Sequence, residues 1–374
     1  MPKQDVKRNL LEHSAVKVRL LGIYLKRYLN IISNDGYTEK IWIHDLFCGE
    51  GIYENGGEGS PLVILREVKD LHFTGVARDK KGPLIDCHFN DLEGEKVKKV
   101  EASIKVKSLY YPRFGGLRFT TNDYKQEVKE LIDTLPKLKK QKAFIFIDPY
   151  DYKSIKANDI KDLLASGKAE VLLFLPTQFM YRFHANGTPE ALKDFIEELT
   201  EYKNWRENDS PWSFIDQLKE AFRAFLGSRF FVDTFTIQKD SNTVFCLFFF
   251  SSHIKGFEKM LEAKWEIDTE QGKGWHFSGN NPTLFFDQKT NGFQDMLKAF
   301  LTTKARTNGE VYEFTLRSGF LPKHANEILH NWQQTGLLKV NGRNSEKVRK
   351  RSFYLGYQYY KDDNDKQKVS FKLN

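Results

Sequence analysis

The sequence predicts an α/β domain with a doubly wound parallel sheet whose last strand is antiparallel, followed by a small winged helix-turn-helix domain. Runs of strand length alternate with helical patterns through the first half of the chain. Two later runs, Phe231–Gln238 and Thr243–Ser251, are joined by a segment too short for a crossover. From Gly292 onward, helical patterns precede a β-ribbon. We therefore expect the two domains to span residues 1–290 and 291–374.

Composition excludes several classes of protein. The chain has 374 residues, of which 40% are hydrophobic, enough for one large core and a second, smaller one. Its longest apolar run, Val244–Phe250, is too short to span a membrane. The polar segment Met1–Asn9 lacks the apolar centre of an export signal. Cys48, Cys87 and Cys246 are widely spaced, which predicts a reducing compartment. We expect a cytoplasmic protein without a membrane partner.

The charge of the chain permits two interpretations. The formal net charge is +8, which suits an anionic partner such as nucleic acid, although a solvated surface explains it equally well. The nine histidines show no metal-ligand spacing and no Cys/His cluster occurs, so we expect no metal. Nothing resembles the motif of a serine nucleophile.

The first helix is expected over Leu10–Ile32, where apolar residues recur at helical intervals and basic residues fill the other positions. The turn residues Asn34-Asp35-Gly36 end it. His13 and Lys17 lie one turn apart near its start. The pattern leaves open whether they face a ligand crevice or cover the surface.

The expected parallel strands are apolar on both faces, as strands covered by helices on both sides are. They are Ile41–Phe47, Ile85–Phe89, Leu117–Thr120, Ala143–Asp148 and Glu170–Leu175. The helices between them are expected at Pro61–Leu71, Gly94–Val106, Tyr124–Leu135 and Ser154–Leu164. Five parallel strands followed by a hairpin resemble the strand succession of Rossmann-like, class I methyltransferases, which use S-adenosylmethionine.

The C-terminal region follows an irregular stretch, Trp265–Phe286. Its helices are expected at Gly292–Leu301, Val311–Gly319 and Pro322–Gln334. A ribbon is expected between Leu337–Val340 and Ser352–Tyr357, with a turn through Asn341-Gly342. Helices followed by a two-stranded wing predict a winged helix-turn-helix.

A glycine-rich turn follows the first strand, in the sequence Asp45-Leu-Phe-Cys-Gly49-Glu-Gly51. Glycines let the backbone turn sharply and approach a ligand closely, and Ser60-Pro61 is a typical helix start. We expect Asp45, Phe47, Gly49 and Gly51 to contact a nucleoside cofactor. The alternative is a loop that only turns the chain. The spacing fits neither a dinucleotide fingerprint nor a P-loop.

The next two strands end in polar residues. Asn90 or Asp91, at the end of the second strand, is expected to contact ribose hydroxyls of the cofactor. Asp123, after the third strand, is expected near an adenine amino group. An N-cap of the following helix explains Asp123 at least as well.

The fourth strand ends in Asp148-Pro149-Tyr150. A carboxylate at this end of an inner parallel strand lies where ligands bind. Amino-methyltransferases place Asp-Pro-Pro-Tyr here, where the Asp accepts from the target amino group and the ring stacks on an extruded base. Asp148 and Tyr150 are therefore the expected catalytic residues. The alternative is an Asp-Pro turn that caps the next helix.

The winged-helix region carries polar and basic candidates for nucleic-acid contacts. Lys323, His324 and Asn326 lie near the start of the third helix, the element that enters a groove in this class of domain. The wing carries Lys347, Arg349, Lys350 and Arg351, which suit phosphate contacts. A solvated run of charges explains the wing equally well.

Together these motifs resemble the three-Cys-motif partner protein (TcmP) family, whose members are methyltransferase-like. The resemblance rests on His13-x-x-x-Lys17, the Asp45–Tyr53 motif, Gly59-Ser60-Pro61-Leu62, Asp148-Pro149 and Lys264-Trp265. The chain departs from the family at Asn90, where an acid is usual, and at Tyr150-Asp151, where Phe-Gly is usual. The resemblance implies S-adenosylmethionine as cofactor and, as a protein partner, a three-Cys-motif protein that is similar to radical-S-adenosylmethionine enzymes.

The leading hypothesis is a methyltransferase that uses S-adenosylmethionine and acts on DNA or RNA. The rival is a non-catalytic adaptor with the same fold, which binds nucleic acid and a partner enzyme. Binding of the cofactor distinguishes the two.

Overall fold

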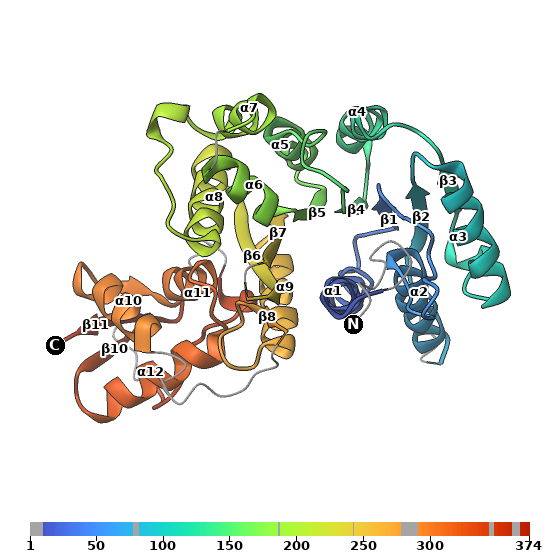
Figure 1. The fold of residues 1–374 in the computed structure, drawn as a ribbon. Helices are drawn as coiled ribbons and strands as arrows, with labels where there is room; N and C mark the ends of the chain where they lie inside the picture. The colour runs from blue at the N-terminus through green and yellow to red at the C-terminus, as the bar shows by residue number, and fades with distance from the viewer. Residues whose placement is uncertain are drawn as a thin grey trace. The chain divides into compact units, whose positions relative to one another are not determined.

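The computed structural model describes residues 10–77, 82–185, 188–241, 243–277, 291–343, 348–360 and 367–374. The chain forms two compact units (Figure 1). The first contains Met1–Gly256 and Gly274–Gly279, and the second contains Phe257–Lys273 and Asn280–Asn374. The expected boundary after residue 290 borders residues outside the described ranges.

In the described part of the first unit, one sheet of eight strands has the order β3-β2-β1-β4-β5-β7-β6-β8. Strands β3 to β5 are parallel, and β7 lies antiparallel between β5 and β6. This is the strand order of class I methyltransferases, so the predicted fold class is confirmed. The strands are β1 (Lys40–Asp45), β2 (Leu84–Asn90), β3 (Leu117–Thr120), β4 (Gln141–Ile147), β5 (Ala169–Leu175), β6 (Phe231–Asp240), β7 (Thr243–Ser251) and β8 (Gly274–His276).

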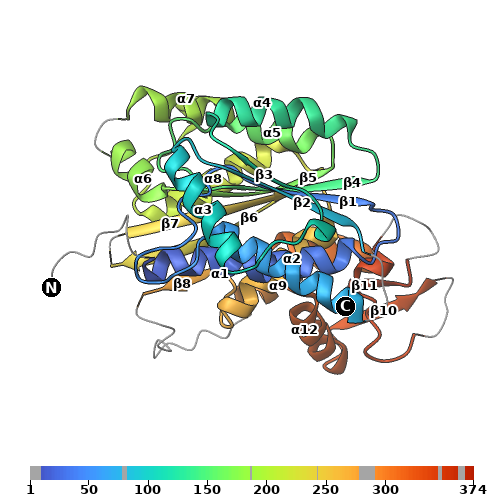
Figure 2. The same ribbon diagram turned by 90° about the vertical axis from the view of Figure 1, so that its right-hand side faces the viewer.

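Helices cover both faces of this sheet, as the apolar strands require. Figure 2 shows α1 and α2 on one face and α4, α5 and α7 on the other. The helices are α1 (Glu12–Ile32), α2 (Ser60–Ala77), α3 (Gly94–Val106), α4 (Tyr124–Thr134), α5 (Ala157–Ala165), α6 (Thr177–Ala185), α7 (Glu190–Leu199) and α8 (Pro211–Leu226). Helix α9 (Ile254–Ile267) starts in the first unit and belongs to the second unit from Phe257 onward. The sequence pattern missed α6 to α9.

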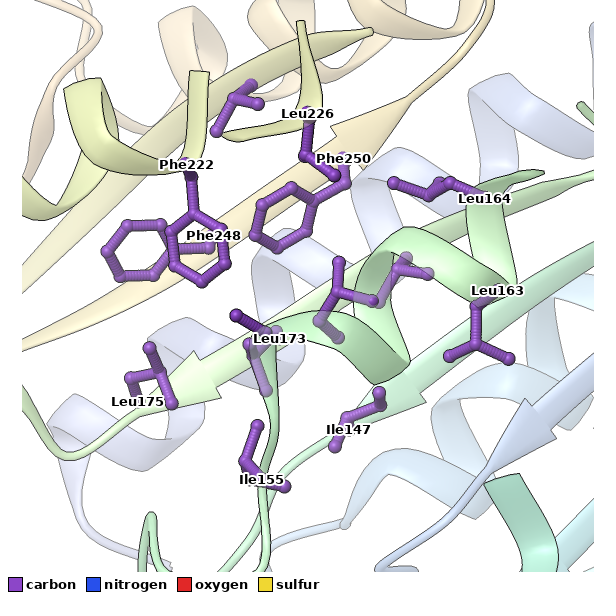
Figure 3. Close-up of a cluster of buried hydrophobic side chains, with 14 of the residues drawn as sticks. Ile147, Ile155, Leu163, Leu164, Leu173, Leu175, Phe222, Leu226, Phe248 and Phe250 are labelled. Carbon is purple, nitrogen blue, oxygen red and sulfur yellow. The ribbon is translucent and has the colours of Figure 1, made fainter. Parts of the chain in front are cut away.

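The core between the sheet and α5 and α8 is built from aliphatic and aromatic side chains (Figure 3). Phe222 of α8 packs on Phe248 and Phe250 of β7, with ring centroids 5.6 and 5.0 Å apart. Alternate residues of a strand share a face, so these two phenylalanines point the same way. Burying a side chain of this size contributes about 1.5–3 kcal/mol. This packing holds β7, whose start lines the cavity described below, against α8.

The segment after the hairpin differs from the expectation. The predicted irregular stretch Trp265–Phe286 is wrong at its start, because α9 continues to Ile267 and Gly274–His276 forms β8. β8 pairs with β6, and a Cβ at Gly274 would lie 2.5 Å from the Thr236 carbonyl oxygen. Gly274 is therefore a strand residue that allows close approach to β6, rather than a loop signal.

The second unit has the element order of a winged helix-turn-helix, as predicted. The elements are α10 (Asn291–Thr302), β9 (Arg306–Thr307), α11 (Asn308–Arg317), α12 (Pro322–Gln334), β10 (Leu338–Gly342) and β11 (Val369–Leu373). The strands form an antiparallel sheet of order β10-β11-β9. A capping box starts α11, in which Thr307 and Glu310 each accept from the other's backbone N–H.

The predicted second wing strand, Ser352–Tyr357, is wrong. β10 pairs instead with β11, with Leu338 opposite Leu373. Asn341-Gly342 looked like a hairpin turn, but β10 runs to Gly342 and the chain returns only at Val369. Val369 and Phe371 are buried on one face of β11, which is the period-two pattern of a strand.

Asn308, at the start of α11, anchors the chain between β10 and β11. The residue is fully buried, its Nδ2 donates to the Tyr359 carbonyl (2.9 Å), and its Oδ1 accepts from Lys368 N (2.9 Å). Asn308→Ala leaves these groups unpaired. We expect a loss of about 2–4 kcal/mol in the free energy of unfolding of this unit, measured by urea titration of tryptophan fluorescence.

The matched control is Asn331→Ala, which changes an exposed asparagine of α12 in the same unit. Equal stability of the two variants would contradict the anchoring role of Asn308.

Candidate cofactor and acceptor site

A cavity of about 250 Å³ lies at the carboxyl-terminal edge of the parallel strands. Ligands of open α/β sheets bind at this edge. Its walls are formed by the turn after β1, the segment after β4, the end of β5, the start of β7, and residues of α1 and α6. The lining residues are Leu10, His13, Ser14, Lys17, Val18, Phe47, Cys48, Gly49, Tyr53, Gly59, Ser60, Asp148, Pro149, Tyr150, Phe174, Pro176, Phe179 and Phe245.

The two glycines of the turn have different steric roles. Both adopt left-handed backbone angles, with φ of +62° at Gly49 and +77° at Gly51. A Cβ at Gly51 would lie 2.9 Å from the Leu62 side chain and 3.1 Å from that of Val100, whereas a Cβ at Gly49 would meet nothing within 4 Å. Gly51 thus packs the turn against α2 and α3, and Gly49 leaves space on the cavity side.

Asp45, the last residue of β1, is fully buried behind this turn. Its carboxylate accepts a hydrogen bond from the Ser60 side chain, and Ser60 lines the cavity. Its Oδ2 atom is buried without a hydrogen-bond partner among the described residues. Burial raises the pKa of Asp45 to about 7, against the lowering effect of the Ser60 hydrogen bond. A cation near the turn would interact favourably with the negative charge of this carboxylate when it is ionised.

Asn90 holds the ends of three strands together. Its Nδ2 donates to the Leu46 and Asn122 carbonyls (3.2 and 3.1 Å). Its Oδ1 accepts from Thr120 Oγ1 (2.8 Å) and Asn122 N (2.9 Å). All four hydrogen-bonding positions of the amide are thus used within the protein, which leaves Asp91 as the better candidate for a ribose.

Asp91, the next residue, binds the glycine turn directly. Its carboxylate accepts from Gly49 N (3.1 Å) and from Glu93 N (3.0 Å). The side chain therefore fixes the position of the glycine turn.

For both Asp123 and Asp148 the alternative to a ligand contact was a helix cap, and the structure shows a cap only at Asp123. Asp123 accepts from Lys125 N (2.9 Å) and is the N-cap of α4, so the capping interpretation is confirmed, while its contact to adenine stays a prediction. Asp148 does not cap the next helix, because α5 starts at Ala157 with Lys156 as its N-cap. The capping interpretation of Asp148 is wrong.

Asp148 lies at the cavity together with two residues of α1. Lys17 Nζ is 2.5 Å from Asp148 Oδ2 and lies 4.2 Å from the centroid of the Phe174 ring. His13 stacks on Phe245, with ring centroids 5.9 Å apart. The sequence left the direction of His13 and Lys17 open, and the structure turns both toward the cavity.

An aromatic wall, which we did not predict from the sequence, completes the site. Phe245 of β7 lies 5.6 Å from Phe174 of β5 and 6.5 Å from Phe179 of α6, between ring centroids. Tyr150 is 69% exposed at the cavity, and its hydroxyl accepts from Lys96 Nζ (2.6 Å). The available signal was the end of β5, since residues there reach the same edge as Asp148.

The candidate residues of the second unit have different surroundings. Lys323 is exposed and Asn326 is half-buried on α12. His324 packs on Trp265, with ring centroids 4.2 Å apart, and its Nδ1 accepts from Leu321 N (3.1 Å). Arg349, Lys350 and Arg351 are exposed, and Lys347 lies outside the described residues. Contacts of these residues to nucleic acid stay predictions.

A family model described as a GMT-like wHTH domain matches residues 266–345. This segment holds α10, β9, α11, α12 and all of β10, which agrees with the winged-helix element order. No curated protein matches the chain.

Solved structures that are similar to the chain include several described as methyltransferases. A Legionella pneumophila protein has 12% identity, covers 67% of this chain and 89% of its own, and gives a TM-score of 0.38. An O-methyltransferase from Bacillus cereus, crystallised with S-adenosylhomocysteine, has 10% identity, covers 67% of this chain and 93% of its own, and gives a TM-score of 0.35. A structure described as a putative rRNA methylase from Clostridium thermocellum has 8% identity, covers 60% of this chain and 95% of its own, and gives a TM-score of 0.29. At these TM-scores the likeness adds nothing to the fold that the strand order shows.

The described residues contain neither a membrane-spanning helix nor a metal-binding cluster. None of the helices there is long and apolar enough to cross a bilayer. Among the same residues, no group of three or more His, Cys, Asp or Glu side chains is arranged to hold a metal ion.

The steric difference between the glycines of the turn is testable. Gly49→Ala meets only the cost of a left-handed backbone, about 1–2 kcal/mol. Gly51→Ala carries the same cost and also overlaps Leu62 and Val100, so we expect a total loss of about 3 kcal/mol or more in the free energy of unfolding. Urea unfolding of the two variants measures this difference, and equal losses would contradict it.

Proposed function

We propose that the protein is a methyltransferase that uses S-adenosylmethionine and acts on nucleic acid. One observation carries the proposal: the methyltransferase strand order brings the glycine turn after β1 and the segment Asp148–Tyr150 to the same cavity. The first element suits the cofactor and the second suits the methyl acceptor.

The residues around the turn fit the cofactor. When bound, S-adenosylmethionine supplies a methyl group on a positively charged sulfur and also carries an ammonium group. The carboxylate of Asp45, whose Oδ2 atom has no partner among the described residues, lies behind Ser60 and would provide the negative charge that these cations require. Gly49 and Gly51 would hold the methionine part alongside Phe47. Asp91 would contact the ribose, and Asp123 would lie near the adenine.

Asp148 and Tyr150 would hold the acceptor. Asp148 offers a carboxylate to an amino group, and the exposed Tyr150 ring offers a stacking surface for an extruded base. Since the sulfonium is intrinsically reactive, the protein's main contribution is alignment of the acceptor with the methyl group. The net charge of +8 and the winged-helix unit, with Lys323 and Arg349–Arg351 exposed, support nucleic acid as the substrate.

Membership of the three-Cys-motif partner family, and with it a three-Cys-motif protein as partner, belongs to the same proposal. Cytoplasmic location is part of it too, supported by three buried cysteines that form no disulfide. The rival, a non-catalytic adaptor, is favoured by one observation: Lys17 already pairs with Asp148 at the acceptor position.

Cofactor affinity should depend on the ionisation of Asp45. Only the ionised carboxylate attracts the ammonium of S-adenosylhomocysteine, and the pKa of Asp45 is about 7. The affinity should therefore fall roughly tenfold as the pH falls from about 7.5 to about 6. In Asp45→Asn the affinity should be weak and nearly independent of pH over this range. Isothermal titration calorimetry with S-adenosylhomocysteine measures both effects.

The matched control for this experiment is Asp148→Ala. Because the charge of Asp148 also raises the pKa of Asp45, this control is measured at about pH 8, where Asp45 is mostly ionised in both proteins. There the removal of Asp148, which would face the acceptor, should leave S-adenosylhomocysteine affinity unchanged while methyl transfer is lost. Absence of S-adenosylhomocysteine binding at millimolar concentration would refute the enzyme and leave the adaptor.

Nucleic-acid binding should depend on salt through the wing. Replacing Arg349, Lys350 and Arg351 together with Gln should reduce the slope of log K against log salt by up to about 3 for duplex DNA. A matched triple replacement of the exposed Lys129, Lys137 and Lys139 in the first unit should leave the slope unchanged. Fluorescence anisotropy with labelled duplex and single-stranded oligonucleotides measures it, and identical slopes for both triple variants would remove the wing from the interface.

A further inference from the structure

The start of α1 forms one wall of the cavity, and the proposed function leaves it without a role. Leu10 N donates to Asn55 Oδ1 (3.1 Å), and Asn55 Nδ2 donates back to the Leu10 carbonyl (2.9 Å). A Cβ at Gly57 would lie 2.5 Å from Leu10 Cβ, so glycine is required at position 57 for the loop to approach Leu10 this closely. This clamp fixes the helix turn that carries His13 and Lys17.

His13 offers an uncharged hydrogen-bond acceptor. Its ring stacks on Phe245, and neither ring nitrogen has a hydrogen-bond partner in the described chain. Burial, followed by the positive charges of Lys239 and Lys17, lowers the pKa of His13 to about 4, against an opposing effect of Asp240. At neutral pH one ring nitrogen therefore keeps a free lone pair beside the cavity.

Lys17 and Asp148 balance each other's charge at the same cavity. Together with the neutral His13, they leave the acceptor side with no unpaired charge among its lining residues. The walls formed by Phe174, Phe179 and Phe245 are aromatic. Such a cavity suits a flat, uncharged ring that carries a hydrogen-bond donor.

We propose that the methyl acceptor is an uncharged heteroaromatic ring, such as a nucleobase, and that His13 accepts a hydrogen bond from the N–H or O–H of its nucleophilic group. This inference rests on the proposed function. In the reaction, the lone pair of the nucleophile forms the bond to the methyl carbon, and the electron pair of the carbon–sulfur bond stays on sulfur. The proton of the nucleophile passes to His13 and from there to water.

The test uses the full chain and four probes: adenosine, guanosine, cytidine and uridine. Each is titrated by calorimetry, with and without saturating S-adenosylhomocysteine, into the wild type, His13→Phe and His13→Gln. The Phe variant keeps a ring that stacks on Phe245 but has no nitrogen, and the Gln variant restores a hydrogen-bond acceptor. The proton NMR signal of His13, assigned by its absence from both variants, reports direct contact.

The expected result is that at least one nucleoside binds the wild type and shifts the His13 signal. His13→Phe should weaken that binding about tenfold or more, and His13→Gln should restore it to within about threefold of the wild type. The affinity for S-adenosylhomocysteine should be the same in all three proteins.

Two results would overturn the assignment of His13: equal nucleoside affinity of the wild type and His13→Phe, or no binding of any of the four nucleosides. Failure of the proposed function gives a different result, namely that S-adenosylhomocysteine does not bind. The nucleoside titration without it then still decides whether His13 holds a heteroaromatic ring.

Discussion

The candidate site depends on the hydrogen bonds of one buried amide, that of Asn90. Its four bonds tie the chain after β1 and the end of β3 to the end of β2. The backbone adds to this, since Cys48 N donates to the Asn90 carbonyl (2.8 Å), and Asp91 then binds Gly49 N. Because an unpaired buried amide is costly, the strand ends and the turn above them adopt one arrangement. This network positions the glycine turn on the proposed cofactor side.

The electrostatics of the site are uneven. On the cofactor side, Asp45 keeps one buried oxygen without a partner, and burial raises its pKa. On the acceptor side, Lys17 neutralises Asp148, and His13 stays uncharged. One half of the crevice thus attracts a cation and the other half is electrically balanced. This asymmetry matches a reaction between a positively charged donor and a neutral acceptor.

Much of the fold could be predicted from the sequence because local signals agree with it. Leu117–Thr120, Thr243–Ser251 and Pro322–Gln334 match their elements, since turn residues or prolines bound them. The prediction of the wing strands was wrong because Asn341-Gly342 has the sequence of a hairpin turn, whereas the partner strand begins only at Val369. The site was less predictable. The role of Asn90 depends on the carbonyls of Leu46 and Asn122, and the direction of His13 depends on how α1 packs. Neither can be inferred from the spacing of residues alone.

The small hairpin after the glycine turn has a consequence for how the two halves of the crevice communicate. Ile52 pairs with Glu58, and Gly59 N donates to the Gly51 carbonyl (2.7 Å), so the loop that carries Asn55 is continuous with the turn. Asn55 in turn grips Leu10 at the entrance to α1. These contacts connect the turn on the proposed cofactor side to the helix start on the proposed acceptor side. By thermodynamic reciprocity, any factor by which one ligand strengthens the other's binding through this connection acts equally in both directions.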